Sequence, residues 1–197
     1  MFQRLNGIPF VFPNNPDTDH NEKLKQFALG IEPQLINLAV TDGWEDDTAT
    51  SPTTSRYGAY NTFQLSPVTE PLLNLIRAGY LLMIESLNIP RVPRIIQSWI
   101  NIHRREGHLE RHTHFFPFIA NYAVNAEGSS TIYGAEKGSH DDVEIKNRNG
   151  QLVITVGYPI YHEVTPWELD EPRITVACDI AGTERNHPER VFLPFDQ

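Results

Sequence analysis

The chain has 197 residues, of which 16 are Lys or Arg and 25 are Asp or Glu, giving a formal net charge of −9. This length favours one domain over residues 1–197, and a hydrophobic fraction of 40% is enough for a packed core. A single cysteine, Cys178, excludes a disulfide framework and a cysteine-rich zinc module. No apolar stretch approaches the ~20 residues of a membrane span, and no signal peptide is evident. The negative charge argues against a nucleic acid partner. Without a signal peptide or a membrane span in the pattern, we expect a cytoplasmic protein without membrane contacts.

Helical patterns occur only in residues 1–90, which we interpret as a helical cover with a long loop. Thr18 or Asp19 is suited to cap a first helix. Hydrophobic residues then recur at the spacing of one helix face, namely Leu24, Phe27, Ala28 and Ile31. Pro33 predicts that this helix stops or bends soon after Ile31, because proline cannot donate the next backbone hydrogen bond.

A second helix is predicted from about Pro67 to Leu87, with its apolar face on Leu72, Leu75, Ile76, Gly79 and Met83. The stretch 41–60 before it is rich in Thr, Ser, Asp and Gly and has no periodicity. It predicts a long loop, which in a compact domain is either a lid over a site or a mobile segment.

From Arg91 onward the pattern changes to short strands separated by turn residues. The predicted strands are 94–103, 118–124, 130–133, 151–156, 159–164 and 173–180. Strands at this spacing are typical of an antiparallel sandwich or barrel. We therefore expect a mainly β, α+β fold with a jelly-roll core over 91–182. The two N-terminal helices should cover one outer face, and residues 183–197 form a C-terminal extension.

Histidines are concentrated in one region of the predicted core. If the stretch around His112 and His114 is extended, both imidazoles project from the same face of a strand and can converge on one metal ion. A third ligand must come from elsewhere, and His162 lies on a later strand in an otherwise apolar row. Glu110 offers an alternative carboxylate ligand, since His108-Leu109-Glu110 also has the spacing of two ligands on one strand face. A lone histidine is more often a buried core residue, but the paired histidines favour a metal site.

The last long strand begins with Arg173 and Thr175, which share a face. A guanidinium fork beside a hydroxyl suits the far carboxylate of a dicarboxylic acid. Taken alone, an arginine at the start of a strand is more often a surface ion-pair partner.

Together these motifs resemble the iron(II)- and 2-oxoglutarate-dependent oxygenases, and more narrowly the small 2OG-Fe(II) oxygenase family of bacteria and bacteriophages. The resemblance covers about residues 95–181. It rests on the order of a strand with Trp99, then Gly107, then His112-x-His114, then His162-x-Val164, then Arg173-x-Thr175. The family implies a double-stranded β-helix (a jelly roll), one Fe(II) ion, and 2-oxoglutarate as co-substrate. It also implies a bacterial cell or a phage-infected host as the location.

Carried over to this chain, the resemblance implies that His112, His114 and His162 hold the iron. Arg173 and Thr175 would bind the distal carboxylate of 2-oxoglutarate, and Asn101 would reach its other end or the substrate. The expected activity is hydroxylation of an unidentified substrate with release of succinate and CO2.

The chain departs from most of the superfamily at His114, where a carboxylate ligand is usual. Three neutral imidazoles leave the ferrous charge undiminished, which favours a dianionic co-substrate and lowers electron donation to iron.

Two other functions fit parts of this pattern. A three-histidine zinc hydrolase or lyase would use the same imidazoles, with metal-bound water as nucleophile, but it needs no arginine for a dicarboxylate. A non-catalytic jelly-roll binding module, for example a virion-associated one, would retain the histidines without using them. The sequence favours a small-molecule or peptide substrate and leaves the oligomeric state open, a homodimer included.

Overall fold

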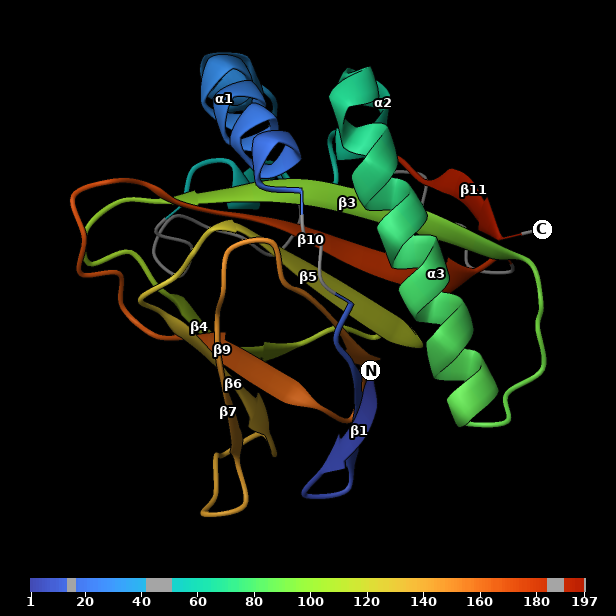
Figure 1. Cartoon of the computed structure of the whole chain (residues 1–197). Coiled ribbons are helices and arrows are strands. Elements are labelled where there is room, and N and C mark those ends of the chain that lie inside the picture. The colour runs from blue at the N-terminus through green and yellow to red at the C-terminus, as the bar shows by residue number, and fades with distance from the viewer. Residues whose placement is uncertain (14–16, 42–50, 184–189, 197) are drawn as a thin grey trace.

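The computed structural model describes residues 1–13, 17–41, 51–183 and 190–196, and within them the chain forms two facing β-sheets with helices on one side (Figure 1). The larger sheet has the order β1-β2-β8-β5-β10-β3-β11 and the smaller one β4-β9-β6-β7. The strands are β1 (Phe2–Leu5), β2 (Ile8–Val11), β3 (Arg94–His103), β4 (Leu109–Thr113), β5 (Phe118–Asn125), β6 (Ser130–Gly134), β7 (Val143–Lys146), β8 (Leu152–Val156), β9 (Tyr161–Val164), β10 (Arg173–Gly182) and β11 (Leu193–Asp196). The helices are α1 (Thr18–Leu35), α2 (Thr62–Leu65) and α3 (Glu70–Ser86), with short 3₁₀ turns at Thr54–Arg56 and Pro67–Thr69.

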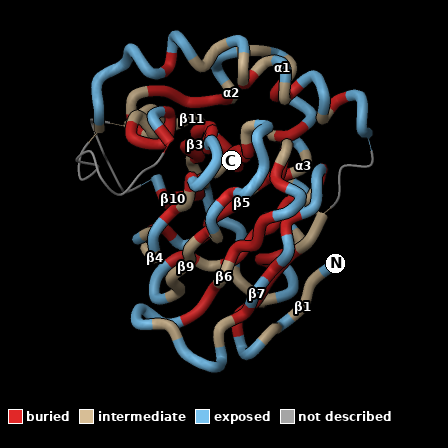
Figure 2. The backbone as a smooth tube through the Cα atoms, turned by 90° about the vertical axis from the view of Figure 1, so that its left-hand side faces the viewer, coloured by how far each residue is buried: buried red, intermediate tan, exposed pale blue. Residues whose placement is uncertain are grey.

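The two faces of the larger sheet differ in polarity. On β10 the residues Ile174, Val176 and Ile180 face the helices and belong to the main hydrophobic cluster, which also contains Leu24 of α1 and Ile76 of α3. The alternate residues of the same strand face the smaller sheet and include charged side chains. Because both faces of the central strands are covered, these strands are buried along nearly their whole length (Figure 2). The fold therefore places its main apolar core under the helices. The space between the sheets holds a smaller hydrophobic cluster, which includes Phe10 and Val143, together with the polar groups of a cavity.

Helix α1 ends at Leu35, soon after Ile31, but Pro33 does not itself stop the helix. Pro33 lies inside the last turn rather than after a stop, and the helix reaches Leu35. Proline removes only one backbone donor there, whereas Leu35 is 3% exposed in the main cluster. Burial of Leu35 therefore outweighs the loss of one hydrogen bond.

The predicted second helix is divided in two. Pro67–Thr69 forms a 3₁₀ turn, which is capped by the Ser66 hydroxyl, and α3 begins only at Glu70. Pro71 occupies the first turn of α3, where its missing N–H costs nothing.

The predicted loop 41–60 is not a mobile segment where the structure describes it. Residues 42–50 lie outside the described part, but 51–60 are packed along β3. The hydroxyls of Ser51 and Thr53 accept hydrogen bonds from the Ile102 N–H at 3.1 and 3.2 Å, and the Tyr60 hydroxyl accepts one from the Ile100 N–H at 2.8 Å. This segment thus satisfies backbone donors of β3 on the edge that β11 leaves uncovered.

The larger sheet extends beyond the predicted core range of 91–182 at both edges. The hairpin β1–β2 adds one edge through a turn in which Asn6 and Gly7 both have positive φ, as an Asn-Gly hairpin turn requires. In the C-terminal segment, β11 pairs with the start of β3 and forms the other edge.

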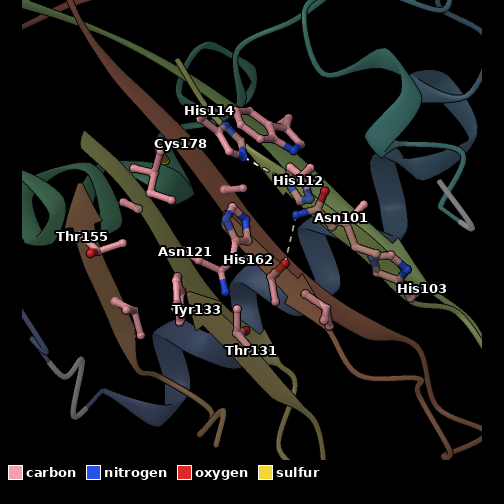
Figure 3. A pocket seen from close by; sticks show the side chains of 18 of the residues that line it. Asn101, His103, His112, His114, Asn121, Thr131, Tyr133, Thr155, His162 and Cys178 are labelled. Carbon is pink, nitrogen blue, oxygen red and sulfur yellow. Dashed lines mark hydrogen bonds between the residues drawn. The ribbon is translucent and has the colours of Figure 1, made fainter. Parts of the chain in front are cut away.

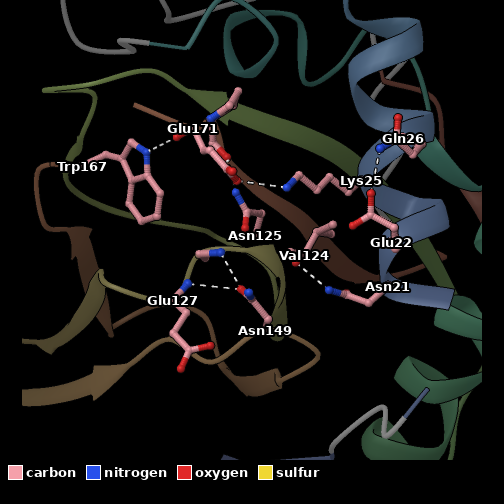
Figure 4. Close-up of polar contacts among 12 residues, drawn as sticks. Asn21, Glu22, Lys25, Gln26, Val124, Asn125, Glu127, Asn149, Trp167 and Glu171 are labelled. Carbon is pink, nitrogen blue, oxygen red and sulfur yellow. Dashed lines mark hydrogen bonds and ion pairs between the residues drawn. The ribbon is translucent and has the colours of Figure 1, made fainter. Parts of the chain in front are cut away.

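Helix α1 is tied to the sheet at the end where β10 begins (Figure 4). The Asn21 side chain donates to the Val124 carbonyl at 2.6 Å, and Lys25 lies 3.1 Å from a carboxylate oxygen of Glu171. These contacts fix the helical layer over one end of the jelly roll. Among the described helices, none has the length and hydrophobicity needed to cross a bilayer.

Candidate metal centre

All six residues that the sequence singled out line one cavity between the two sheets. They are Asn101, His112, His114, His162, Arg173 and Thr175. Figure 3 labels Asn101 and the three histidines. The cavity runs along the inner face of β10, from Arg173 at the start of the strand toward its C-terminal end. Its remaining wall is largely apolar, with Leu109, Ile119, Val153 and Val164.

Three imidazoles meet near one end of this cavity. His112 and His162 lie directly opposite each other in the β4–β9 pair, and His114 follows immediately after β4. One ring nitrogen of each residue lies within 4.8 Å of the others, and no other such histidine, cysteine or carboxylate group occurs in the described part of the chain. This separation suits three nitrogens around one ion, because metal–nitrogen bonds are about 2.0–2.1 Å long.

The hydrogen bonds of two rings show which nitrogens are available. His112 Nδ1 donates to the Glu110 carbonyl at 2.7 Å, and His114 Nδ1 donates to the Asp179 carboxylate at 2.7 Å. Each ring then carries a lone pair on Nε2, and these two Nε2 atoms face each other at 3.2 Å. Two lone pairs at this distance repel unless a proton or a metal cation lies between them. The geometry therefore fits a bound cation.

The electrostatic environment keeps two of these rings, those of His112 and His162, neutral. Burial, together with the neighbouring His114 ring, lowers the pKa of His112 to about 3. Burial also lowers the pKa of His162 well below its usual value, and its Nδ1 is buried without a hydrogen-bond partner. A neutral imidazole is the form that binds a metal, so no proton has to be displaced at neutral pH.

Aromatic packing fixes the orientation of two of the rings. His114 stacks on Trp99 of β3 with ring centroids 5.8 Å apart, and His162 stacks on Tyr133 of β6 at 5.6 Å. The turn after His114 is also held closely by Gly157, where an added Cβ would lie 2.5 Å from the His114 carbonyl oxygen and 2.0 Å from that of Phe116. Only glycine permits this approach.

Glu110, the alternative ligand considered from the sequence, lies outside the cluster. The register of β4 against β9 shifts between Leu109 and His112. This bulge interrupts the strict alternation, so Leu109 and His112 both line the cavity while Glu110 is exposed. Glu110 contributes its backbone carbonyl to His112 and not its carboxylate.

Arg173 is a buried cation at the other end of the cavity. It is 1% exposed, so it is not the surface ion-pair partner that its position alone favoured. Its Nε donates to the Ser129 hydroxyl at 3.0 Å, whereas Nη2 is buried and has no hydrogen-bond partner among the described residues. Burial lowers the pKa of Arg173 to about 10, which still leaves the guanidinium charged at neutral pH. A buried, incompletely paired guanidinium suits an anionic ligand.

Thr175 and Asn101 lie next to Arg173 on the same wall. They are directly opposite each other across β10 and β3, and Asn101 Nδ2 donates to the Thr175 hydroxyl at 3.1 Å (dashed in Figure 3). The Asn101 carbonyl oxygen in turn accepts from the Thr54 hydroxyl at 2.7 Å. Because Thr175 accepts from Asn101, its own hydrogen is available to a ligand in the cavity.

The sequence interpretation missed two residues that contact the cavity lining: Asp179, which bonds His114, and Ser129, which bonds Arg173. The alternation that places Arg173 and Thr175 on one face of the strand also places Asp179 there. A signal was therefore present in the strand pattern. Ser129 had none, because it lies in a turn far from Arg173 in sequence.

Comparisons with known proteins agree on the fold. No protein family profile matches the chain, and no curated protein matches it in sequence. Among solved structures, a prolyl-4-hydroxylase from Pseudomonas putida superposes with a TM-score of 0.58 at 12% identity, covering 87% of this chain and 91% of that one. The non-heme alpha-ketoglutarate-dependent epimerase SnoN from nogalamycin biosynthesis gives 0.60 at 13%, covering 90% and 77%. The 2OG complex of a viral collagen prolyl hydroxylase from Paramecium bursaria Chlorella virus-1 gives 0.56 at 10%, covering 88% and 96%. The chain therefore has the mainly β jelly-roll fold of the 2-oxoglutarate oxygenases.

Proposed function

We propose that this protein is an Fe(II)- and 2-oxoglutarate-dependent oxygenase that hydroxylates a small-molecule or peptide substrate. The proposal is supported by the fold, by the three-histidine cluster and by the buried guanidinium in the same cavity. Solved structures with this fold include proteins named as hydroxylases, as an epimerase and as a carbocyclase, so the fold alone does not select the reaction.

The metal would be held by the Nε2 atoms of His112 and His114 together with a ring nitrogen of His162. All three side chains reach the cavity from the smaller sheet or the turn that follows β4, and two of them are fixed by aromatic stacking. Such fixed ligands hold the coordination geometry without reorganisation when the metal binds. A bound ferrous ion with 2-oxoglutarate supplies the oxidative chemistry, in which decarboxylation to succinate and CO2 is coupled to oxygen insertion.

The distal carboxylate of 2-oxoglutarate would be bound by Arg173 and Thr175. The guanidinium provides paired N–H donors and the Thr175 hydroxyl provides a third, while Asn101 holds that hydroxyl in place. The shape of the cavity restricts which anion can bind. A molecule that pairs with the Arg173 guanidinium must also reach the metal along the side of β10 that faces the smaller sheet. A short dicarboxylate with a second chelating end meets both requirements.

The remaining wall of the cavity is largely apolar, with Leu109, Ile119, Val153 and Val164. Apolar walls strengthen the electrostatic interactions of the groups between them and would help to protect a reactive oxidant from side reactions.

The buried Arg173 is the observation that carries the proposal. Three imidazoles alone also fit a zinc hydrolase or lyase, in which metal-bound water is the nucleophile. That chemistry has no use for a cation that is 1% exposed and has an unpaired Nη2 in the metal cavity. A non-catalytic module would have no reason to retain this costly group either.

An anaerobic titration with Fe(II) and 2-oxoglutarate tests the proposal directly. Chelation of the metal by the keto acid produces a visible charge-transfer band, which we expect in the wild-type protein. Arg173→Ala should bind Fe(II) normally but require at least about 100-fold more 2-oxoglutarate for the same band, since each of the two charge-assisted hydrogen bonds of the fork contributes about 1.5–3 kcal/mol. Arg91→Ala, which removes an arginine paired with Asp196 outside the cavity, is the matched control. Absence of the band in wild type, or an undiminished band in Arg173→Ala, would exclude the proposed function.

A further inference from the structure

The inner face of β10 ends in a buried carboxylate beside the histidine cluster. Asp179 is 1% exposed and lies on the same face of the strand as Arg173 and Thr175. Asp179 is not a member of the three-histidine cluster. Its Oδ1 contacts Nδ1 of His114, the ring nitrogen outside the cluster (the outer nitrogen), and not Nε2. A buried carboxylate is retained only where specific partners compensate for its desolvation.

Asp179 has two charged or polar partners at unequal distances. Its Oδ1 accepts from His114 Nδ1 at 2.7 Å, which is a short hydrogen bond. Its Oδ2 lies 3.6 Å from Arg190 Nη1, which is an ion pair but too long for a direct hydrogen bond. The stronger contact of the carboxylate is therefore to the imidazole.

The three rings differ in what holds their outer nitrogen. His112 donates to the neutral Glu110 carbonyl, and His162 Nδ1 has no hydrogen-bond partner in the described chain. The outer nitrogen of His114, by contrast, is bonded to an anion. A carboxylate on the outer nitrogen fixes the tautomer and ring orientation of a metal-binding histidine and raises its basicity.

The hydrogen bond between Asp179 and His114 is relevant because none of the three proposed metal ligands is a carboxylate. His114 occupies the position at which a carboxylate would place negative charge directly on the metal. We propose that Asp179 is a positioning residue of the metal centre, which supplies that negative charge through the His114 imidazole. The inference rests on the three-histidine metal site of the proposed function, but it does not depend on 2-oxoglutarate.

Arg190 holds the other side of the carboxylate. Its guanidinium lies 4.7 Å from the Tyr57 ring centroid and 5.2 Å from that of Phe116, and it donates to the Tyr57 hydroxyl at 2.5 Å. These contacts fix Arg190, so its charge stays beside Oδ2 and leaves Oδ1 for His114. Arg190 thus sets the direction of the carboxylate, whereas Asp179 acts on the metal ligand.

The first test compares metal affinity in two matched variants. Asp179→Asn keeps the shape and an acceptor oxygen but removes the charge, and Asp196→Asn does the same at a buried aspartate that pairs with Arg91 outside the cavity. Calorimetric titration with Co(II) alone should show affinity about 10- to 100-fold weaker in Asp179→Asn and within twofold of wild type in Asp196→Asn. Equal affinity in wild type and Asp179→Asn would overturn the inference.

A second comparison separates this role from a purely structural ion pair. Arg190→Gln removes the cation and leaves the Asp179–His114 hydrogen bond possible. We expect a much smaller loss of Co(II) affinity than in Asp179→Asn, whereas an Asp179 that serves only to pair with Arg190 predicts equal losses. In the Fe(II) and 2-oxoglutarate complex, Asp179→Asn should also shift the charge-transfer band to higher energy, because a less basic His114 donates less electron density to iron.

A measurement on the wild-type protein covers the case in which Asp179→Asn does not fold. Nitrogen-15 NMR of the metal-free protein should show His114 with its hydrogen on Nδ1 and a strongly deshielded Nδ1–H proton. A His114 with its hydrogen on Nε2 alone would overturn the inference. Because the Co(II) and NMR readouts use no 2-oxoglutarate, they remain decisive even if the protein fails to bind that co-substrate.

Discussion

The two ends of the cavity are opposite in charge, although one strand provides both. At the start of β10, Arg173 is a buried cation with an unpartnered Nη2. At its far end, Asp179 is a buried anion that is fully engaged with His114 and Arg190. Between them lie the imidazoles. The anionic end is thus complete within the protein, whereas the cationic end has no counter-charge in the described part of the chain.

This difference indicates where a ligand belongs. A protein that needed Arg173 only for stability would pair it, as Asp179 is paired, because leaving a buried charge uncompensated is costly. One end of the cavity has an unpaired guanidinium, and the other has imidazole lone pairs around a space that fits a metal cation. This arrangement is suited to an anion that also chelates a metal.

The largest expected effect is on metal affinity, and it distinguishes a proposed ligand from a neighbouring residue. His114→Ala removes one of the two Nε2 atoms that face each other, so we expect loss of metal affinity by more than about 100-fold, beyond the effect of an outer partner. Glu110→Ala should retain the metal, because its exposed carboxylate does not reach the cavity. Metal content after gel filtration, measured by mass spectrometry, checks both variants. Metal loss in Glu110→Ala with retention in His114→Ala would move the site.

A smaller effect is expected from altering the shape of the cationic end while keeping its charge. Arg173→Lys retains a cation but loses the planar fork and the Nε contact to Ser129. We expect 2-oxoglutarate affinity about tenfold weaker than in wild type and stronger than in Arg173→Ala, with metal affinity unchanged. Titration of the charge-transfer band measures this. An Arg173→Lys variant as weak as Arg173→Ala would mean that the fork, and not the charge, dominates binding.

The smallest effect concerns the pH dependence of stability. Burial, together with the nearby Arg173 charge, lowers the pKa of His103 to about 3. Below pH 6.5 the unfolded chain therefore binds a proton at this residue that the folded chain does not, so stability falls as pH falls from 6.5 toward 3. The loss approaches about 1.4 kcal/mol per pH unit for each such group well below pH 6.5.

Urea unfolding of the metal-free protein between pH 6.5 and 5 measures this slope above the range in which most carboxylates titrate. His103→Gln should give a shallower slope, since glutamine does not titrate. An unchanged slope would show that His103 is not held neutral by the fold.

Much of the site was visible in the sequence because it follows strand alternation. The pairs Arg173 and Thr175 on β10, and Trp99 and Asn101 on β3, line the cavity as a period of two requires. The same rule gave a wrong face for Glu110, because a bulge in β4 shifts the register and a bulge leaves no clear mark in the residues. Local periodicity is therefore informative only where pairing is regular.

The parts that could not be predicted depend on contacts between distant segments. Residues 51–60 look like an unstructured loop, yet their hydroxyls are fixed by β3 donors that only the folded edge presents. Leu35 extends α1 past Pro33 because tertiary burial decides that helix end. Ser129 reaches Arg173 only once β6 lies across the cavity.

The most direct test of the central claim is a crystal structure of the protein grown anaerobically with Mn(II) and 2-oxoglutarate, with anomalous data collected at the manganese edge. We predict one anomalous peak within about 2.3 Å of ring nitrogens of His112, His114 and His162, with the distal carboxylate of 2-oxoglutarate on Arg173. A peak elsewhere, or a co-substrate that leaves Arg173 unpaired, would contradict the account.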